Sequence, residues 1–220
     1  MTDLVIFGAG EIAEIAHFYF SHDTQHRVAA FTVDGSYLKQ DRFCGMPVVA
    51  FEEIAHAFPP ARHAAFAALG YARVNQIRAE KVAALKAAGY PLLSYVSSRA
   101  TTFGGLIHGE NCFILEDNTI QPFAKIGMNV TLWSGNHIGH HSVIEDNVFI
   151  SSHVVVSGGV VVGNGSFLGV NSTVRDHVRI GRRCVIGAGA LILADTADES
   201  VWTAPSSEMS RVPSSRLRRI

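Results

Sequence analysis

One candidate site lies near the start of the chain. Gly8 and Gly10 follow a short apolar run, and Gly8-Ala9-Gly10 is typical of a turn whose backbone N–H groups approach a phosphate. Asp34 follows a second apolar run, where an acidic side chain could bind a ribose hydroxyl. A full NAD site needs two βαβαβ halves, for which this region is too short. The pattern favours one bound nucleotide, and a plain strand-to-helix turn stays open.

Cysteine and histidine are the other side chains that could carry chemistry. Cys44, Cys112 and Cys184 are scattered and have no metal-ligand spacing. No sequence neighbour indicates an activated thiolate at Cys112 or Cys184. Isolated cysteines favour a reducing compartment over a disulfide framework, so we expect a cytoplasmic protein. The chain has 11 histidines, which include the adjacent pair His140 and His141. A histidine with a free nitrogen could act as a general base near neutral pH.

A strict six-residue repeat must position these histidines. Every sixth residue is a branched aliphatic one, namely Ile114, Ile120, Ile126, Leu132, Ile138, Ile144, Ile150, Val156, Val162, Leu168, Val174, Ile180, Ile186 and Ile192. The following position is often glycine. This period fits neither an α-helix nor a flat strand. It resembles the hexapeptide-repeat transferases, whose all-β left-handed parallel β-helix closes one triangular coil with three hexads. Stacked coils would then bury a continuous core.

The residues before the repeat alternate between predicted strands and helices. We expect strands at 4–7, 28–33, 64–69 and 92–95, and helices at 10–20, 51–58 and 73–88. This order predicts a small α/β, Rossmann-like βαβ domain with a parallel sheet. The predicted organisation is therefore a nucleotide-binding domain at 1–96, a β-helix at 97–205 and a tail at 206–220.

Composition limits the partners. The chain has 220 residues, with 18 Lys and Arg against 19 Asp and Glu, so it has no basic field to attract nucleic acid. No apolar stretch approaches the roughly 18 residues of a membrane span, and the first residues do not resemble a signal peptide. We therefore expect small-molecule partners and copies of the chain itself.

The two predicted domains together resemble the nucleotide-sugar acyltransferases, which include bacillosamine and perosamine N-acetyltransferases and sialic acid O-acetyltransferases. The most specific segments are 136–151 (NHIGHHSVIEDNVFIS), Gly158-Gly159 and 167–171 (FLGVN). The resemblance implies transfer from acetyl-CoA to a nucleotide-linked amino sugar, most often to the 4-amino group of a 4,6-dideoxyhexose for surface polysaccharides. It also implies a homotrimer with acetyl-CoA between neighbouring prisms, and no metal.

The resemblance places the general base at His140. Relatives commonly carry an acid directly after this histidine, whereas this chain has His141. Glu145 or an acid of a neighbouring subunit could orient His140, or His141 could share the task. The coil length adds an independent point, because Gly158 should lie one coil above His140, ~4.8 Å away. Its N–H could donate to the thioester oxygen as negative charge develops there, and the resemblance points to the same amide.

The resemblance also implies the binding residues. For acetyl-CoA these are Phe149, Gly158, Val170 and Ala188. For the nucleotide sugar they are Gly10, Glu11, Asp34, Gly70 and Tyr71, with Asn75 and Arg78 nearby, and the glycine-rich turn adds Gly8. Arg78 suits a diphosphate, and a solvated helix face stays equally open for it. His137 and His153 could touch a substrate or could be plain surface residues.

Three other functions stay open. The protein could be an O-acetyltransferase or could use a longer acyl group. It could be a zinc enzyme of the γ-carbonic anhydrase type, although His141 and His177 are two coils apart, roughly 9.6 Å, too far to share one metal within a subunit. It could also be a sugar-nucleotide-binding scaffold that has lost catalysis, for which the missing acid after His140 is the best support.

Overall fold

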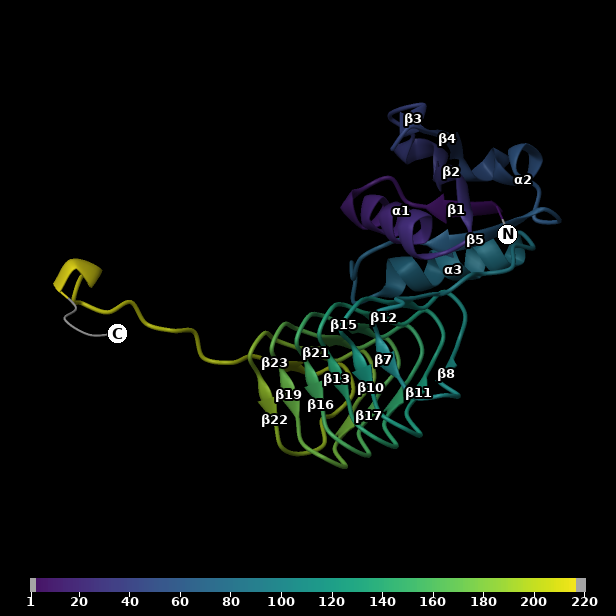
Figure 1. Ribbon diagram of the computed structural model, residues 1–220. Helices are drawn as coiled ribbons and strands as arrows, with labels where there is room; N and C mark the ends of the chain where they lie inside the picture. Colours follow the sequence, from purple (N-terminus) through teal and green to yellow (C-terminus); the bar gives the residue numbers. More distant parts are fainter. Residues whose placement is uncertain (1–2, 217–220) are drawn as a thin grey trace.

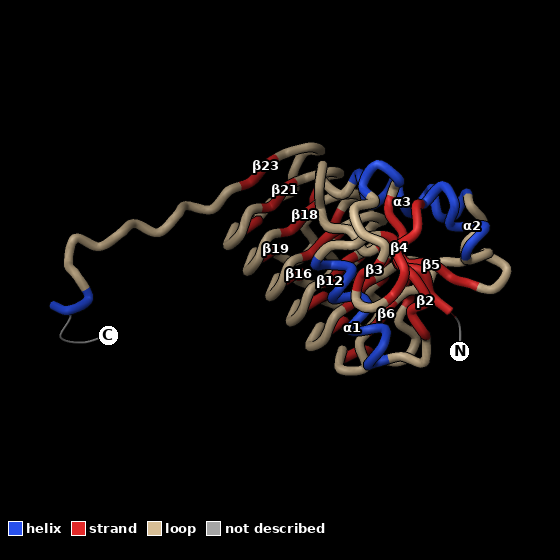
Figure 2. Tube along the Cα trace, turned by 90° about the horizontal axis from the view of Figure 1, so that it is seen from above, coloured by secondary structure: helices blue, strands red, loops and turns tan. Residues whose placement is uncertain are grey.

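A computed structural model describes residues 3–216, and residues 1–2 and 217–220 lie outside the described part. An N-terminal α/β part lies against one end of a long β-prism, and an extended segment leaves the other end (Figures 1 and 2). Of the predicted tail at 206–220, the structure describes residues up to Arg216, which ends the short 3-10 helix η3 (Ser214–Arg216). No helix among the described residues is long and apolar enough to cross a membrane.

The N-terminal part contains the predicted parallel sheet. Its strands are β1 (Asp3–Phe7), β2 (Arg27–Val33), β3 (Arg42–Phe43), β4 (Met46–Ala50) and β5 (His63–Ala67), in the order β3-β4-β2-β1-β5. All neighbours are parallel except β3 and β4, which form a hairpin that the sequence analysis missed. Both hairpin turn residues, Cys44 and Gly45, have positive φ, as a type I′ turn requires.

The helices of this part follow the predicted order with shifted ends. They are α1 (Glu11–Asp23), the 3-10 helices η1 (Gly35–Tyr37) and η2 (Phe51–Glu53), α2 (Ile54–Ala57) and α3 (Gln76–Ala87). Helix α3 begins three residues later than expected because Arg73, Val74 and Asn75 all adopt a left-handed backbone with φ of 51°, 51° and 67°. The predicted strand at 92–95 is reduced to a bridge between Ala65 and Leu92, and the chain then enters the prism.

The prism consists of two-residue strands joined by four-residue turns, except for a longer connection between its last two strands, residues 193–200. Three sheets form its faces, which we call faces one, two and three. Face one contains β7 (Thr101–Thr102), β10 (Thr119–Ile120), β13 (His137–Ile138), β16 (Val155–Val156), β19 (Thr173–Val174) and β22 (Leu191–Ile192). Face two contains β8 (Ile107–His108), β11 (Lys125–Ile126), β14 (Val143–Ile144), β17 (Val161–Val162) and β20 (Arg179–Ile180). Face three contains β6 (Tyr95–Val96), β9 (Phe113–Ile114), β12 (Thr131–Leu132), β15 (Phe149–Ile150), β18 (Phe167–Leu168), β21 (Val185–Ile186) and β23 (Val201–Trp202).

The six-residue period explains this architecture. All fourteen repeated aliphatic residues are at most 3% exposed, and they form one continuous core along the prism. Strands pair in parallel with a register of eighteen residues, as between His137 and Val155. Every sixth residue from Gly105 to Gly189 also has a left-handed backbone, and most of these are Asn, Asp or Gly, which tolerate positive φ. The predicted parallel β-helix with three hexads per coil is confirmed.

The N-terminal part packs on face three. The Asn111 carboxamide oxygen accepts the Ala67 N–H at 2.7 Å, and its amide donates to Asn129 Oδ1 at 3.0 Å. Asn129 in turn donates to Asn147 Oδ1 at 2.8 Å, so three left-handed turn residues form a ladder along one corner. A further contact between the two parts comes from α1, where the Tyr19 hydroxyl donates to Glu116 Oε2 at 2.5 Å. Burial, together with this acceptor, raises the pKa of Tyr19 to about 12.

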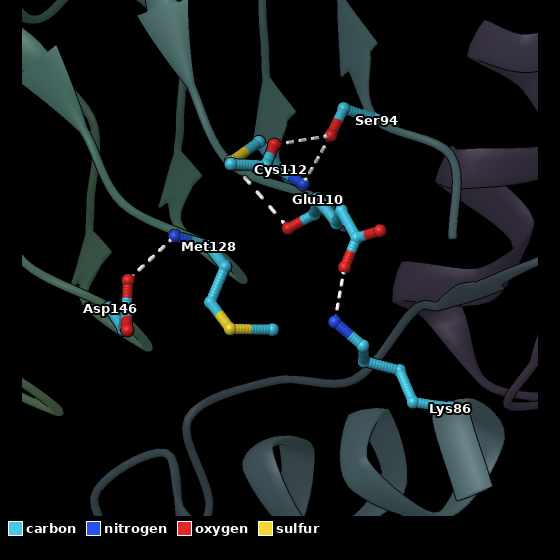
Figure 3. A network of polar contacts seen from close by, with 7 residues as sticks. Lys86, Ser94, Glu110, Cys112, Met128 and Asp146 are labelled. Carbon is cyan, nitrogen blue, oxygen red and sulfur yellow. Dashed lines mark hydrogen bonds and ion pairs between the residues drawn. The ribbon is translucent and has the colours of Figure 1, made fainter. Parts of the chain in front are cut away.

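Further polar contacts tie the first coil to its neighbours (Figure 3). Ser94 Oγ accepts the Cys112 N–H at 2.9 Å, and Lys86 of α3 forms an ion pair with Glu110. Burial raises the pKa of the Cys112 thiol to about 11, which disfavours a thiolate nucleophile there. The junction therefore fixes the N-terminal part on the prism and leaves faces one and two uncovered by it.

Candidate active site

The chemistry-bearing histidines lie on the corner between faces one and two. His140 and His141 occupy the turn from β13 to β14, and Gly158 occupies the equivalent turn one coil further, from β16 to β17. Both histidines are exposed, while the aliphatic residues of the same coil, such as Ile138 and Ile144, are fully buried. The repeat thus holds a solvent-facing pair of imidazoles on a rigid corner.

The imidazole of His140 lies directly against the backbone of Gly158. A Cβ at Gly158 would lie 2.6 Å from both Cε1 and Nε2 of His140, a distance that real Cβ atoms do not show. The space beside this ring therefore exists only because residue 158 is glycine. The predicted juxtaposition of His140 and Gly158, derived from an eighteen-residue coil, is present in the structure.

The Gly158 N–H is a free donor, and a second glycine explains why. One coil below, His140 occupies the turn position that is equivalent to Gly158. Its backbone N–H is capped by the side chain nineteen residues before it, since Gln121 Oε1 accepts that N–H at 2.8 Å. Glu145 Oε2 caps the Asn164 N–H at 2.9 Å at the same spacing on another corner. The residue nineteen before Gly158 is Gly139, which has no side chain. Among the described residues the Gly158 N–H has no acceptor, so it can donate to a substrate.

The two adjacent histidines contact each other. His140 Nδ1 lies 3.1 Å from His141 Nδ1, and the two rings are nearly perpendicular, at 85°. The ion pairs within residues 3–216 include no histidine. Glu145, one of the acids considered for orienting His140, lies on the corner between faces two and three, where it pairs with Arg179 at 3.6 Å. Glu145 therefore does not orient His140.

The residues predicted for acetyl-CoA divide into two groups. Val170 and Ala188 are exposed and lie one coil apart on the corner between faces three and one, as the repeat predicts. Phe149 instead points from face three toward the N-terminal part and is only 2% exposed. Its ring packs on Tyr71 and Phe167 with centroids 5.1 and 5.7 Å away. The predicted acetyl-CoA contact at Phe149 is wrong, because the domain junction covers this side chain.

The N-terminal part contains a pocket of about 570 Å³ at the carboxyl ends of β1, β2 and β5. Gly8 and Asp34 line it, and Lys81 of α3 forms an ion pair with Asp34 at 2.6 Å. A Cβ at Gly8 would meet the Ala68 carbonyl at 2.8 Å, and its φ of 128° is also unfavourable for other residues. Lys39 and Arg73 add positive charge to the lining and Tyr37 adds an aromatic ring, while Glu80 adds a second acid beside apolar side chains.

Four further predicted nucleotide-sugar residues surround this pocket without lining it. Gly10 is the N-cap of α1 and Glu11 is exposed in its first turn. Gly70 follows β5, and Tyr71 is 54% exposed, with its ring against Phe167 at 4.7 Å. These residues remain accessible to a ligand that extends from the pocket toward the prism.

The structure overturns the prediction that Arg78 and Asn75 bind the sugar nucleotide. Arg78 is 1% exposed, and its guanidinium makes six hydrogen bonds, chiefly to Asn129 and to the carbonyls of Asn147 and Val148. Asn75 is equally buried and donates to the carbonyls of Gly165 and Ser166. Burial lowers the pKa of Arg78, and the hydrogen bonds offset the cost of burying its charge. Both residues join the two domains, so a diphosphate cannot reach them.

Replacing Arg78 by methionine should therefore destabilise the protein. The change keeps an apolar chain of similar length but leaves several buried carbonyls without a donor, which should lower the free energy of unfolding by about 3 kcal/mol. Urea unfolding would measure the difference, with Arg62→Ala as a control because Arg62 is exposed in the same domain. Equal stability of the two variants would contradict the structural role of Arg78.

The remaining histidines do not assemble a metal site. His141 and His177 occupy the same turn position two coils apart, and the His177 ring lies over Gly159 between them. His137 lies on the outer side of face one, and the His153 ring fills the space beside Gly135 on another corner. Among residues 3–216, no group of three or more His, Cys, Asp or Glu side chains could hold a metal ion.

Sequence reasoning missed several residues of the site. Gln121 caps the His140 N–H, whereas Gly139 has no side chain to cap the Gly158 N–H. Each lies nineteen residues before the amide concerned, and this spacing could have indicated the difference. Lys81, which pairs with Asp34, gave no local signal because it comes from a helix 47 residues away.

Comparison with known proteins supports the fold. Residues 123–194 match the family described as bacterial transferase hexapeptide (six repeats), in windows at 123–158, 141–176 and 159–194. The chain thus carries the hexapeptide repeat that its period predicted. Among curated proteins, none matches the chain.

Solved structures resemble the chain over nearly its whole length. The acetyltransferase domain of PglB from Neisseria gonorrhoeae, in complex with acetyl coenzyme A, is 20% identical, with 90% of this chain and 94% of that chain covered and a TM-score of 0.78. A histidine-to-asparagine variant of perosamine N-acetyltransferase from Caulobacter crescentus, in complex with CoA and GDP-perosamine, is 22% identical, with 91% and 93% covered and a TM-score of 0.80. WeeI from Acinetobacter baumannii is 17% identical, with 91% and 96% covered and a TM-score of 0.69.

Proposed function

We propose that this hexapeptide-repeat protein is an acyltransferase that moves the acetyl group of acetyl-CoA to an amino group of a nucleotide-linked sugar. The observation that carries the proposal is the His140 imidazole held against the backbone of Gly158, whose N–H is uncapped. Two of the similar structures hold acetyl-CoA, or CoA together with GDP-perosamine, which supports both substrates. The proposed acceptor is the 4-amino group of a 4,6-dideoxyhexose destined for a surface polysaccharide, as the family resemblance implies.

In the proposed reaction the sugar nitrogen attacks the thioester carbonyl directly. A C–N bond forms, negative charge develops on the carbonyl oxygen, and the Gly158 N–H donates a hydrogen bond to that oxygen. The C–S bond then breaks and coenzyme A leaves as the thiolate. His140 Nε2 takes the proton that the nitrogen loses, and it returns that proton to the departing sulfur. No acyl-enzyme is needed, in agreement with the burial of Cys112 and Cys184.

The proposed active site is shared between copies of the chain. His140 and Gly158 lie on the corner between faces one and two, whereas Val170 and Ala188 lie on the corner between faces three and one. Face one separates these corners, so one acetyl-CoA molecule reaches both sets most simply when a neighbouring prism contributes one of them. We therefore propose a homotrimer with acetyl-CoA between prisms. Analytical ultracentrifugation would test the trimer.

The pocket beside Gly8 is proposed to hold the nucleotide. The Gly10 end of α1 presents backbone N–H groups without a side-chain cap, which suits a phosphate, and Asp34 would accept from a ribose hydroxyl. Lys81, Lys39 and Arg73 supply positive charge, which Asp34 and Glu80 of the same pocket partly offset.

Replacing Asp34 by alanine should raise the KM for the nucleotide sugar about tenfold, the equivalent of about 1.4 kcal/mol of lost binding. The KM for acetyl-CoA should not change, because the pocket lies in the N-terminal part. Asp41→Ala is a suitable control, since Asp41 is exposed in the same domain and does not line the pocket. Equal KM values for both variants would remove Asp34 from the site.

One screen tests substrate and reaction together. Purified protein would be incubated with acetyl-CoA and a panel of GDP-, dTDP- and UDP-linked 4-amino sugars, with free thiol detected and products identified by mass. The proposal predicts thiol release that depends on one amino sugar and an N-acetylated product. Acetylation of a hydroxyl would shift the function to O-acetyl transfer, and binding of the sugar nucleotide without any transfer would indicate a scaffold.

A further inference from the structure

The contact between His140 and His141 restricts where their protons lie. At 3.1 Å the two Nδ1 atoms are within hydrogen-bonding distance, and one must donate while the other accepts. Two Nδ1–H groups would repel each other, and two lone pairs would leave the contact without a proton. In a neutral pair, therefore, one imidazole carries its proton on Nδ1 and the other carries it on Nε2.

We propose that His141 is a positioning residue whose Nδ1 accepts the Nδ1–H of His140 and so keeps the His140 Nε2 free as the base. The inference rests on the proposed function for the identity of the base. The edge of the His140 ring that contains Cε1 and Nε2 faces Gly158, so Nε2 is the ring nitrogen beside the proposed oxyanion donor. The hydrogen bond that one imidazole nitrogen makes determines the protonation of the other. His141 thus selects the reactive tautomer of its neighbour.

The pair is anchored to the coil below it. The His140 N–H donates to Gln121 Oε1 at 2.8 Å, and the His141 N–H donates to the Pro122 carbonyl at 3.3 Å. The exposed ring of Phe123 lies under His141 with centroids 4.7 Å apart. These contacts hold the backbone of both histidines in place, and the Phe123 ring supports the imidazole of His141, so the pair is positioned before a substrate arrives.

The turns directly below and above the pair contain no carboxylate. The coil below presents Gln121, Pro122 and Phe123, and the coil above presents Ser157, Gly158 and Gly159. The titratable and charged groups around them by register are Arg175, Asp176 and His177 one coil further, His137 on β13, and Lys125 on β11. Within the described chain, then, the imidazole of His141 is the only partner at His140 Nδ1.

Two substitutions at residue 141 distinguish a side chain that accepts a hydrogen bond from one that only fills space. Asparagine tolerates the left-handed backbone, with φ of 59°, and is found at the same turn position at Asn129 and Asn147. It also offers an oxygen acceptor. Phenylalanine occupies that position at Phe123 but accepts no hydrogen bond. His141→Phe should therefore lower kcat by about 10- to 100-fold, the usual cost of removing an orienting partner, with KM little changed. His141→Asn should restore most of the loss.

A carboxylate at this position gives a second readout. His141→Asp should stabilise the protonated form of His140, because an anion beside an imidazole favours its cation. The acidic limb of the pH profile of kcat/KM should therefore move to higher pH. An unmoved limb would mean that residue 141 does not lie beside the base of the reaction.

Nitrogen-15 NMR of the imidazoles tests the hydrogen bond in the unliganded protein. We expect the proton of His140 on Nδ1 in the wild type and loss of this preference in His141→Phe. A wild-type His140 with its proton on Nε2, or equal activity of the Phe and Asn variants, would overturn the proposal. The NMR result does not depend on turnover. Absence of acetyl transfer by the wild type would thus reject the proposed function without deciding the hydrogen bond.

Discussion

Replacing His140 by asparagine is expected to lower kcat for acetyl transfer by about 10²- to 10⁴-fold, the usual contribution of a general base. Asparagine has a similar width but cannot accept a proton at neutral pH, so the attacking nitrogen would have to lose its proton to water. The side chain of His140 is exposed and packs on no buried residue of the core, so the fold should not change. Steady-state kinetics of the variant would measure the loss.

The same variant provides its own controls. Because His140 lies on the prism surface, thermal unfolding and the oligomeric state should match the wild type, and coenzyme A should still bind. A variant with intact assembly and undiminished kcat would exclude His140 as the base. His137 or His153 would then become the next residues to replace.

Gly158→Ala is expected to lower kcat by about 100-fold, even though it adds a single methyl group. The new Cβ would lie 2.6 Å from Cε1 and Nε2 of His140, so the imidazole must move away. Misplacing a catalytic group by about 1 Å can cost 10²-fold in rate. Gly158 does not have the left-handed backbone that other residues avoid, so alanine introduces no backbone strain there. The expected result is a folded, weakly active protein.

Gly104→Ala is the matched control for this substitution. Gly104 lies on the same corner of the prism, in its first coil, and a Cβ there would meet no atom within 4 Å. The activity of the Gly104→Ala variant should equal that of the wild type. If both glycine variants were fully active, the close approach of His140 to Gly158 would have no catalytic meaning.

The prism could be predicted from the sequence because its core is periodic. Each Ile, Leu or Val of the repeat is equivalent to its neighbours, so one rule places all fourteen inside and stacks residues eighteen apart. The same rule placed Gly158 over His140 and Ala188 over Val170. Side chains that follow the repeat are therefore predictable in position, even where their chemistry is not.

Contacts between the two domains could not be predicted in this way. Arg78 was expected to bind a diphosphate because the family resemblance pointed to it and a guanidinium suits phosphate oxygens, whereas it is enclosed by oxygen acceptors of turns 51 to 70 residues later. Phe149 follows the repeat but points toward a surface that only the folded N-terminal part creates. The period of a solenoid determines which way a side chain points and contains no information about what covers it.

The most direct test follows a ¹³C-labelled acetyl group from acetyl-CoA in the presence of the accepted nucleotide amino sugar. For the wild type, the account predicts that the carbonyl signal moves from the thioester to an amide on the sugar. For His140→Asn, the label should stay on coenzyme A over the same time. A label that remains on coenzyme A with every amino sugar of the panel, or an amide formed equally fast by His140→Asn, would contradict the account.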